Sequence, residues 1–317
     1  MPANPGQGTE TVENMQEPLG SDLAMPAIAA AAQAEPEILA PSGKDAAGEN
    51  FPVGSRLIAP ALRPHVMRYY AFARAADDIA DAPELSPDEK VRRLDLMEAG
   101  LAPAARWPAV AVRLGESLRE TGVPVAHASD LLVAFRRDAG KARYADWAEL
   151  LDYCRYSAHP VGRFLLDLHS EAPETGAMGD ALCAALQVLN HLQDCGEDRR
   201  ALDRVYLPQD WMAEEGMALG DLDAAAASPA LRRVIGRCLD ASDALLDRAA
   251  PLSRAIRSRR LGAEVAAIQR LARRLSARLR REDPLALRVK HSRRDLAHGA
   301  LAGLLRAAGL SALAGPA

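Results

Sequence analysis

The sequence predicts an all-α fold, on three observations. Ala, Leu and Arg, which favour helices, are abundant, whereas Phe, Trp and Tyr together make up only 4 % of the chain. From about residue 64 onward, apolar residues recur at the spacing of one face of an α-helix, with short breaks. No stretch alternates between apolar and polar residues for long enough to predict a strand. We therefore expect a helical bundle, and a hydrophobic content of 49 % suffices for a sizeable core.

Helix boundaries follow from capping residues and from the positions of Pro and Gly. Ser86 and Pro87, followed by Glu89, have the pattern of an N-cap, a first helical residue and a capping-box acid. Asp146 and Glu149 repeat the capping pattern before a long apolar stretch. The expected helices cover residues 62–82, 87–101, 107–121, 126–138, 146–170, 177–201, 229–249, 252–281 and 286–307.

The chain divides into three parts by composition. Residues 1–47 are rich in Pro, Gly, Ala, Gln and Glu, which predicts a disordered leader. Residues 48–295 carry the helical pattern of a single domain, and residues 296–317 form an apolar tail. The tail could rest on a membrane surface, fray, or cover the core as a helix.

Composition also limits the compartment and the partners. The formal net charge is -4, without a long block of one sign, which argues against a dedicated nucleic-acid binder. The four cysteines are scattered, and neither a long uncharged apolar run nor a secretory signal is visible. We expect a cytoplasmic protein, and the tail leaves open a peripheral position at the inner membrane face.

Two polar stripes lie on helices that are otherwise apolar. In the first, Tyr70, Arg74, Asp77 and Asp81 stand at offsets 0, 4, 7 and 11. In the second, the offsets are 0, 3, 7 and 11, for Gln187, Asn190, Asp194 and Asp198. At roughly 100° per residue, each set falls on one narrow side of its helix. A single pair of this kind is usually a solvated helix face, but two matched stripes favour a site.

The carboxylate pairs of the stripes favour a bound cation. Like charges at positions i and i+4 destabilise a helix by a few tenths of a kcal/mol, and a cation offsets that repulsion. Oxygen ligands without Cys or His suit Mg²⁺, which is usually completed by water and substrate phosphate. The predicted metal ligands are Asp77, Asp81, Asn190, Asp194 and Asp198. Two such helices facing each other would form a metal-bridged diphosphate site.

At these residues the chain resembles the squalene/phytoene synthase family, over about residues 50–295. The family's first motif, YxxxRxxDDxxD, is met by Tyr70, Arg74, Asp77, Asp78 and Asp81. Its second motif, QxxNxxxDxxED, is met by Gln187, Asn190, Asp194, Glu197 and Asp198, and the DRxYxP element that follows by Asp203, Arg204, Tyr206 and Pro208. The resemblance implies an isoprenoid-synthase helical bundle with a central cavity.

Three further segments resemble the hopanoid-pathway branch of the family. They are residues 49–53, 153–163 and 190–198. That branch converts presqualene diphosphate to hydroxysqualene, which implies presqualene diphosphate and water as partners, with other squalene-pathway enzymes as further ones. His159 stands where the branch usually has Asn. Residues 53–56 lack the His-Ser segment of many relatives that condense two prenyl diphosphates, which argues against simple head-to-head condensation.

The resemblance also implies roles for individual residues. The carboxylates and Asn190 would hold Mg²⁺ on the diphosphate, and Arg74 with Lys290, Arg293 and Arg294 would offset its charge as it departs. The alternatives are an ion pair with Asp77 or Asp78 within the helix for Arg74, and a solvated surface for the other three. The expected substrate-binding residues are Tyr70, Gln187, Arg204, Tyr206, Lys290, Arg293, Ser157, His159 and Gly162. The candidate wall residues are Phe72, Tyr153, Val161, Gly162, Leu165 and Leu189, and the ring of Tyr153 would stabilise positive charge. Plain core packing is the favoured alternative for all of them except Tyr153 and Gly162, which match pocket positions of the family.

Capture of the final cation requires one positioned water. Pro160, placed inside the helix expected at 146–170, cannot donate to the carbonyl of Tyr156. We hypothesise that this carbonyl, with Ser157 or His159, positions the water, and an ordinary proline kink is the alternative.

Two other functions compete with this one. The chain could instead be a presqualene diphosphate or phytoene synthase, or an inactive relative that binds lipid or assists assembly. All four paired aspartates are present, which argues against the inactive relative.

Overall fold

The computed structural model describes residues 57–310, and the leader expected at 1–47 lies outside them. The helices are α2 (Arg63–Asp81), α3 (Pro87–Ala99), α4 (Ala109–Thr121), α5 (Ala126–Asp138), α6 (Trp147–Ser157), α7 (His159–Leu168), α8 (Thr175–Leu202), α9 (Gln209–Glu214), α10 (Pro229–Ala249), α11 (Leu252–Ala255), α12 (Arg259–Leu279) and α13 (Arg293–Ala307), with a 3₁₀ helix, η3, at Leu219–Asp223. The all-α fold is therefore confirmed.

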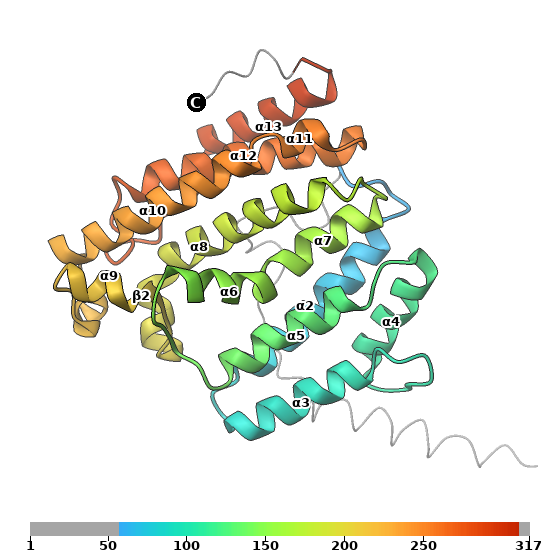
Figure 1. Ribbon diagram of the computed structural model, residues 1–317, viewed down its shortest axis with the longest axis horizontal. Coiled ribbons are helices and arrows are strands. Elements are labelled where there is room, and N and C mark those ends of the chain that lie inside the picture. Colours follow the sequence, from blue (N-terminus) through green and yellow to red (C-terminus); the bar gives the residue numbers. More distant parts are fainter. Residues whose placement is uncertain (1–56, 311–317) are drawn as a thin grey trace, which may run out of the picture.

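The helices form a broad bundle with α8 through its middle (Figure 1). α12 and α13 lie along one edge and α3 along the opposite edge. α8 packs against α7, α10 and α12, while α2 packs against α4 and α5. One group of buried apolar side chains lies among α2, α3, α4 and α5 and includes Phe164 of α7. The other lies among α6, α8, α10 and α12.

The expected helix starts at Ser86 and Asp146 are confirmed. The Ser86 hydroxyl accepts from the amide of Glu89 at 3.3 Å. The Asp146 carboxylate accepts from the amide of Glu149 at 2.8 Å. Each cap satisfies an amide that has no partner within its helix.

The single helix expected at 146–170 is wrong, because the chain breaks at Ala158. This residue has φ -126° and ψ -44°, outside helical geometry, and separates α6 from α7. Pro160 lies in the first turn of α7, where a missing amide hydrogen costs nothing. It therefore begins a helix and does not kink one.

Two other expected helices also differ from the structure. The stretch 252–281 is divided into α11 and α12, and the Ser258 hydroxyl caps α12 by accepting from Leu261 N. The helix expected at 286–307 begins only at Arg293, after the N-cap Ser292. α13 then continues past residue 296, where the apolar tail was expected to start.

The expected absence of strands is wrong as well. β1 (Arg143–Tyr144) pairs in parallel with β2 (Val205–Pro208), with Arg143 opposite Val205. Strands of two and four residues are too short to show an alternating pattern. The pairing matters for the site. Tyr206 lies in β2 and Arg204 directly precedes it, so the strand places both side chains in the region between α2, α5 and α8.

Candidate active site

A cavity of about 400 Å³ lies between α2, α5, α7, α8 and α12. Its lining is predominantly apolar, from residues such as Val66, Leu131, Leu182 and Val265. A large apolar cavity with a few polar groups at its wall is the usual form of a small-molecule site.

The first stripe forms part of this wall. Tyr70, Arg74 and Asp77 all line the cavity, on the same side of α2 as Val66 and Ala73. Arg74 Nη2 lies 2.9 Å from Asp77 Oδ2, so the arginine and the carboxylate face the cavity as a pair. The sequence correctly placed these three residues on one stripe.

The second stripe continues the cavity-lining side of α8. Leu182, Cys183 and Leu186 line the cavity, and Asn190 and Asp194 follow at successive turns toward the helix C-terminus. Burial raises the pKa of Asp194, as do the nearby Asp198 and Glu197, while Arg288 lowers it. The net shift is upward, with burial as its largest cause and the two neighbouring carboxylates as smaller ones.

Arg288 contacts the second stripe from the segment before α13. Its Nε lies 3.1 Å from Asp194 Oδ1, and Nη2 donates to Oδ2 at 3.3 Å. The sequence identified a basic cluster in this segment but named Lys290, Arg293 and Arg294 and not Arg288, although all four are exposed. The order of basic residues along an irregular segment gave no signal for choosing Arg288.

Arg204 joins the first stripe to the end of α5. Its Nη1 donates to Asp81 Oδ1 at 2.6 Å, and its Nη2 donates to the carbonyls of Ala80 at 3.0 Å and Asp138 at 3.1 Å. The guanidinium is buried, so these bonds are shielded from water. Arg204 was expected to bind substrate, and in the structure its fork holds the C-terminal end of α2.

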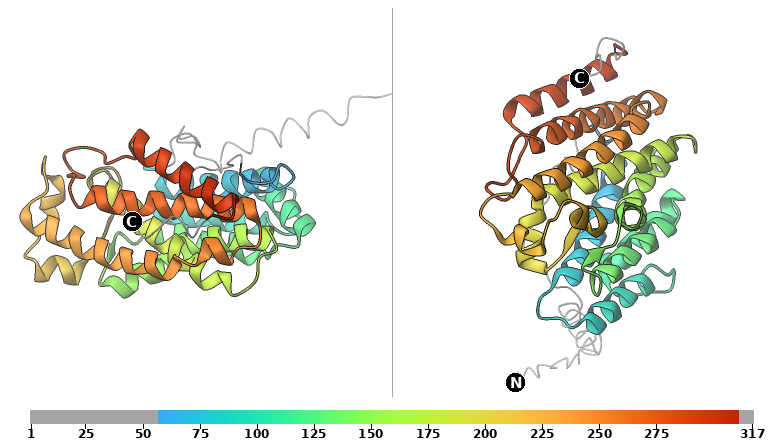
Figure 2. Two further views of the ribbon diagram at one scale, coloured as in Figure 1. Left: turned by 90° about the horizontal axis from the view of Figure 1, so that it is seen from above. Right: turned by 60° about the vertical axis from the view of Figure 1, so that its left-hand side comes forward.

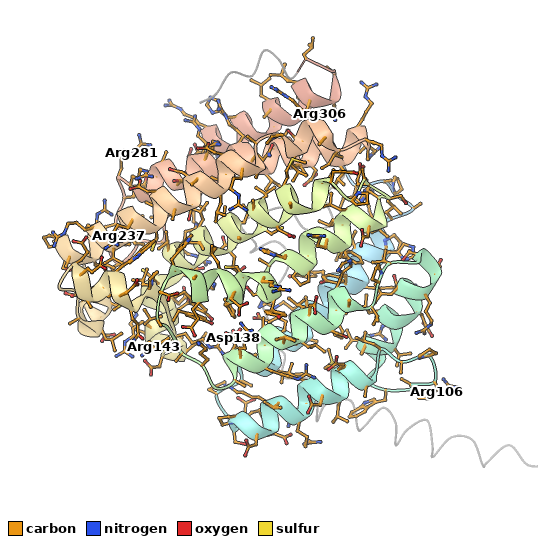
Figure 3. The ribbon with its side chains drawn as sticks, in the orientation of Figure 1. Arg106, Asp138, Arg143, Arg237, Arg281 and Arg306 are labelled. Atoms are coloured by element: carbon orange, nitrogen blue, oxygen red, sulfur yellow. The ribbon has the colours of Figure 1, made fainter. Side chains whose placement is uncertain are left out.

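A buried polar group adjoins Arg204 and includes Asp138, which is labelled in Figure 3. Asp138 accepts from the Tyr153 hydroxyl at 2.8 Å and from the Tyr206 hydroxyl at 3.3 Å. Burial raises the pKa of Asp138 to about 6, although Arg204 and the Tyr153 hydrogen bond act in the opposite direction. Nothing in the sequence pattern pointed to Asp138. Tyr153 is buried in this group and is not part of the cavity lining.

His191 continues the connection to the second stripe. Its ring stacks on Tyr206 with 3.5 Å between centroids, and its Nδ1 lies 3.7 Å from Asp198 Oδ2. Gln187 Nε2 lies 3.1 Å from His191 Nε2. Contacts through Arg204, Asp138, Tyr206 and His191 thus lead from Asp81 to Asp198. Side-chain contacts therefore connect the two stripes, and of the five expected metal ligands only Asp77 lines the cavity itself.

The α6–α7 break contributes to the wall of the cavity. Ser157, Val161, Gly162 and Leu165 line it, as expected for the last three. The Ser157 hydroxyl is buried and has no hydrogen-bond partner within residues 57–310. A Cβ at Gly162 would lie 2.5 Å from Cys183 Sγ, so glycine is what allows α7 to approach α8 this closely.

Several expected residues do not line the cavity: Phe72, Leu189 and His159, as well as Tyr153, Gln187, Arg204 and Tyr206. Phe72 and Leu189 are fully buried in the core and are not among the lining residues. His159 Nδ1 lies 3.8 Å from Asp180 Oδ2, and burial lowers the pKa of this histidine. A residue that the sequence did not single out, Glu264, is a buried acid of α12 in the cavity wall.

The carboxylate and amide oxygens of the two stripes are donors of the kind that suits Mg²⁺. Within residues 57–310, no three His, Cys, Asp or Glu side chains stand close enough to hold a metal by themselves. Cations already accompany the carboxylates, with Arg74 at Asp77, Arg204 at Asp81 and Arg288 at Asp194. Mg²⁺ commonly takes only one or two carboxylates from a protein and completes its shell with water and phosphate oxygens. The donor set suits an ion that arrives with a diphosphate.

The fold and the site are those of an all-α protein with an apolar cavity and two acidic helix stripes. The model of the squalene/phytoene synthase family matches residues 44–295. The chain belongs to this family and is an enzyme of it.

Similar proteins agree with this assignment. A hydroxysqualene synthase of Zymomonas mobilis is 46 % identical over 83 % of this chain and 91 % of its own. One of Rhodopseudomonas palustris is 48 % identical over 78 % of this chain and 85 % of its own. Among solved structures, squalene synthase HpnC from Alicyclobacillus acidocaldarius is 32 % identical with a TM-score of 0.65, over 80 % of this chain and 94 % of that one.

In the part of the chain that the structure describes, no helix is long and apolar enough to cross a membrane.

Proposed function

We propose that this enzyme converts presqualene diphosphate to hydroxysqualene, with Mg²⁺ bound between the two stripes. The proposal rests on an apolar cavity whose wall carries Arg74 and Asp77 of the first stripe, and on the contacts that link Asp81 to Asp198 of the second stripe. A hydrocarbon chain with a diphosphate at one end has the same division into an apolar and a charged part. The relatives named hydroxysqualene synthase, at 44 to 48 % identity, support the choice of reaction within the family.

The first step is departure of the diphosphate, in which the C–O bond breaks and its electron pair leaves with the oxygen. Asp77, Asp81, Asn190, Asp194 and Asp198 would hold Mg²⁺, which neutralises the charge of the leaving group. Arg74, in the cavity wall beside Asp77, adds a fixed cation on the same side. Arg288 does so beside Asp194. Fixed positive groups near a developing negative charge stabilise its formation.

The apolar wall then controls the cation that remains. Rearrangement of the cyclopropylcarbinyl cation must finish before bulk water reaches it, and leucine, valine and phenylalanine side chains exclude water from most of the cavity. One water finally adds its oxygen to the carbocation and loses a proton, which gives the alcohol.

Ser157 is the residue that we propose to position this water. Its hydroxyl is buried at the cavity wall without a hydrogen-bond partner in the described residues. A water beside it would form a hydrogen bond with this hydroxyl and so satisfy a buried polar group. His159 lies near Asp180 and is not a lining residue. The argument from a carbonyl freed by Pro160 inside a helix no longer applies, because Pro160 begins α7.

Product analysis tests the proposal. Purified protein with Mg²⁺ is incubated separately with presqualene, farnesyl and geranylgeranyl diphosphates, and the products are identified by mass spectrometry. We expect hydroxysqualene from presqualene diphosphate. Turnover of farnesyl or geranylgeranyl diphosphate alone would instead assign a head-to-head synthase, and no turnover of any would assign an inactive relative.

A matched pair of serine variants tests the water. Ser157→Ala should lower the share of hydroxysqualene among the products and raise that of dehydrated or rearranged hydrocarbons. Ser242→Ala is the control, because this buried serine donates to the carbonyl of Cys238 in α10 and does not line the cavity. An unchanged product distribution in Ser157→Ala would remove Ser157 from the mechanism.

A further inference from the structure

Helix α13 turns two glycines inward and three of its four leucines outward. On the inner side, a Cβ at Gly299 would lie 3.0 Å from Leu271, and one at Gly303 would lie 3.0 Å from the carbonyl of Ala263. On the outer side, Leu296, Leu301 and Leu304 are 51 %, 53 % and 67 % exposed. A helix whose leucines only stabilise the fold would point them at the core. The outer side of α13 is therefore an exposed apolar surface that suits binding to an apolar partner.

The position of α13 makes this side accessible. Both Figure 1 and Figure 2 show α13 at the edge of the bundle, with α12 between it and the rest of the molecule. α12 in turn lines the cavity with Leu261, Val265 and Ile268. The outward leucines thus lie on the far side of a helix that forms the cavity wall.

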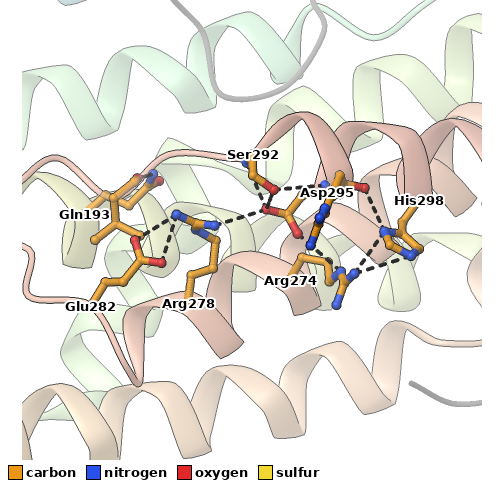
Figure 4. A network of polar contacts seen from close by, with 9 residues as sticks. Gln193, Arg274, Arg278, Glu282, Ser292, Asp295 and His298 are labelled. Atoms are coloured by element: carbon orange, nitrogen blue, oxygen red, sulfur yellow. Dashed lines mark hydrogen bonds and ion pairs between the residues drawn. The ribbon is translucent and has the colours of Figure 1, made fainter.

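The N-terminal end of α13 is fixed by a polar network, drawn in Figure 4. The Asp295 carboxylate accepts from Ser292 N at 2.8 Å and from its hydroxyl at 2.7 Å, and Arg274 and Arg278 lie 3.3 Å and 3.5 Å away. Burial alone would raise the pKa of Asp295, but the bonds from Ser292 and the two arginines hold this pKa below its ordinary value.

The C-terminal end is fixed from within the helix. Arg306 Nε donates to the carbonyl of Ser253 at 2.6 Å, and its Nη2 donates to that of Ile256 at 2.9 Å. Both ends are thus attached to the bundle, which makes the outward leucines a fixed surface and not part of a frayed segment.

The charges around this surface are positive. The acid of α13 is Asp295, which is buried, so the outer side of the helix carries no carboxylate. Lys290, Arg293 and Arg294 are exposed next to its beginning. Basic residues beside exposed leucines are complementary to a surface with anionic groups above an apolar interior.

We propose that the outer face of α13, formed by Leu296, Leu301 and Leu304 with Lys290, Arg293 and Arg294 beside it, binds to an anionic lipid bilayer surface. The leucines enter the boundary between headgroups and acyl chains, and the basic side chains contact the lipid phosphates. The bilayer is bound peripherally, by one helix that stays packed on α12.

Vesicle co-sedimentation of the full chain tests the proposal. We expect the protein to bind vesicles that contain phosphatidylglycerol, to bind pure phosphatidylcholine vesicles more weakly, and to lose binding as salt is raised. The double variant Leu301→Ser/Leu304→Ser should weaken the binding by at least about tenfold, because both leucines would leave the interface.

The control variant is Val125→Ser/Leu219→Ser. These residues are 49 % and 37 % exposed, between α4 and α5 and in η3, so the variant removes two exposed apolar side chains elsewhere on the molecule. We expect it to bind vesicles like the unaltered protein. Thermal unfolding of both double variants verifies that they remain folded.

Three results would overturn the proposal. The unaltered protein could fail to bind either kind of vesicle, or the two double variants could bind equally well. Sedimentation without lipid could also show a dimer that Leu301→Ser/Leu304→Ser dissociates, which would assign the face to a second copy of the chain. Vesicle binding needs neither substrate nor metal, so each result is independent of the proposed reaction.

Discussion

Replacing Arg204 by Met removes the guanidinium that holds the end of α2. Asp81, with a side chain 20 % exposed, would lose a bond of 2.6 Å, and the carbonyls of Ala80 and Asp138 would each lose a donor. Removing one partner of a buried ion pair typically costs about 3–5 kcal/mol, because the other charge stays desolvated. We therefore expect Arg204→Met to lower the free energy of unfolding by about 3–5 kcal/mol.

Urea unfolding followed by circular dichroism measures this loss. Arg204→Lys should recover only part of it, since an ammonium group cannot reach all three acceptors with the fixed fork of arginine. Arg143→Met is the control, because Arg143 binds Asp203, which is 65 % exposed, and such surface pairs contribute about 1 kcal/mol or less. Equal losses for Arg204→Met and Arg143→Met would refute the role given to Arg204.

Three further predictions concern stability. The folded-state pKa of Asp138, about 6, is above that of a free aspartate, so ionisation of this carboxyl opposes folding. Relative to Asp138→Asn, the free energy of unfolding of the unaltered protein should fall by about 3 kcal/mol as pH rises from about 4 to about 6, and no further above that. Urea unfolding across this pH range measures the change. Gly162→Ala should cost about 1–3 kcal/mol through contact with Cys183 Sγ, and adding Cys183→Ala should restore most of it in a double-mutant cycle of thermal unfolding. Because the pKa of Asp295 is lowered in the folded state, its ionised carboxylate stabilises the protein above the pKa of a free aspartate, and this stabilisation is lost as pH falls through the lower folded-state pKa. Asp295→Asn should remove the stabilisation at neutral pH, which would appear as faster hydrogen exchange in α13. Unchanged exchange would contradict the anchoring.

Features that depend on nearby residues could be predicted from the sequence. The helix starts at Ser86 and Asp146 follow from hydrogen bonds to amides three residues away. The stripe of Tyr70, Arg74 and Asp77 follows from the periodicity of one helix. Local spacing decides these features, so they did not require the tertiary structure.

The break at Ala158 could not be predicted in the same way. Proline is compatible with the first turn of a new helix and with a kink inside a long one, and the apolar spacing on both sides is helical. The choice between them depends on how α7 packs on α8, where Gly162 meets Cys183. Tertiary packing, not the local sequence, decides this point.

Partners far apart in the chain were also beyond the sequence pattern. Arg204 and Asp81 are separated by 123 residues, and Asp194 and Arg288 by 94. The sequence supplied a set of basic residues for the second stripe, but only the path of the segment before α13 determines that Arg288 reaches it. Tyr153 was expected in the cavity wall, whereas its bond to Asp138 places it beside the wall in the buried polar group.

Calorimetric titration with inorganic diphosphate, with and without Mg²⁺, tests most directly whether both stripes hold one metal-bound diphosphate. The account predicts binding that requires Mg²⁺ and that Asp77→Asn and Asp194→Asn each weaken by at least about tenfold. Asp240→Asn, at a carboxylate 73 % exposed on α10, should leave it unchanged. Binding that is independent of Mg²⁺, or that is sensitive to one stripe only, would contradict the account.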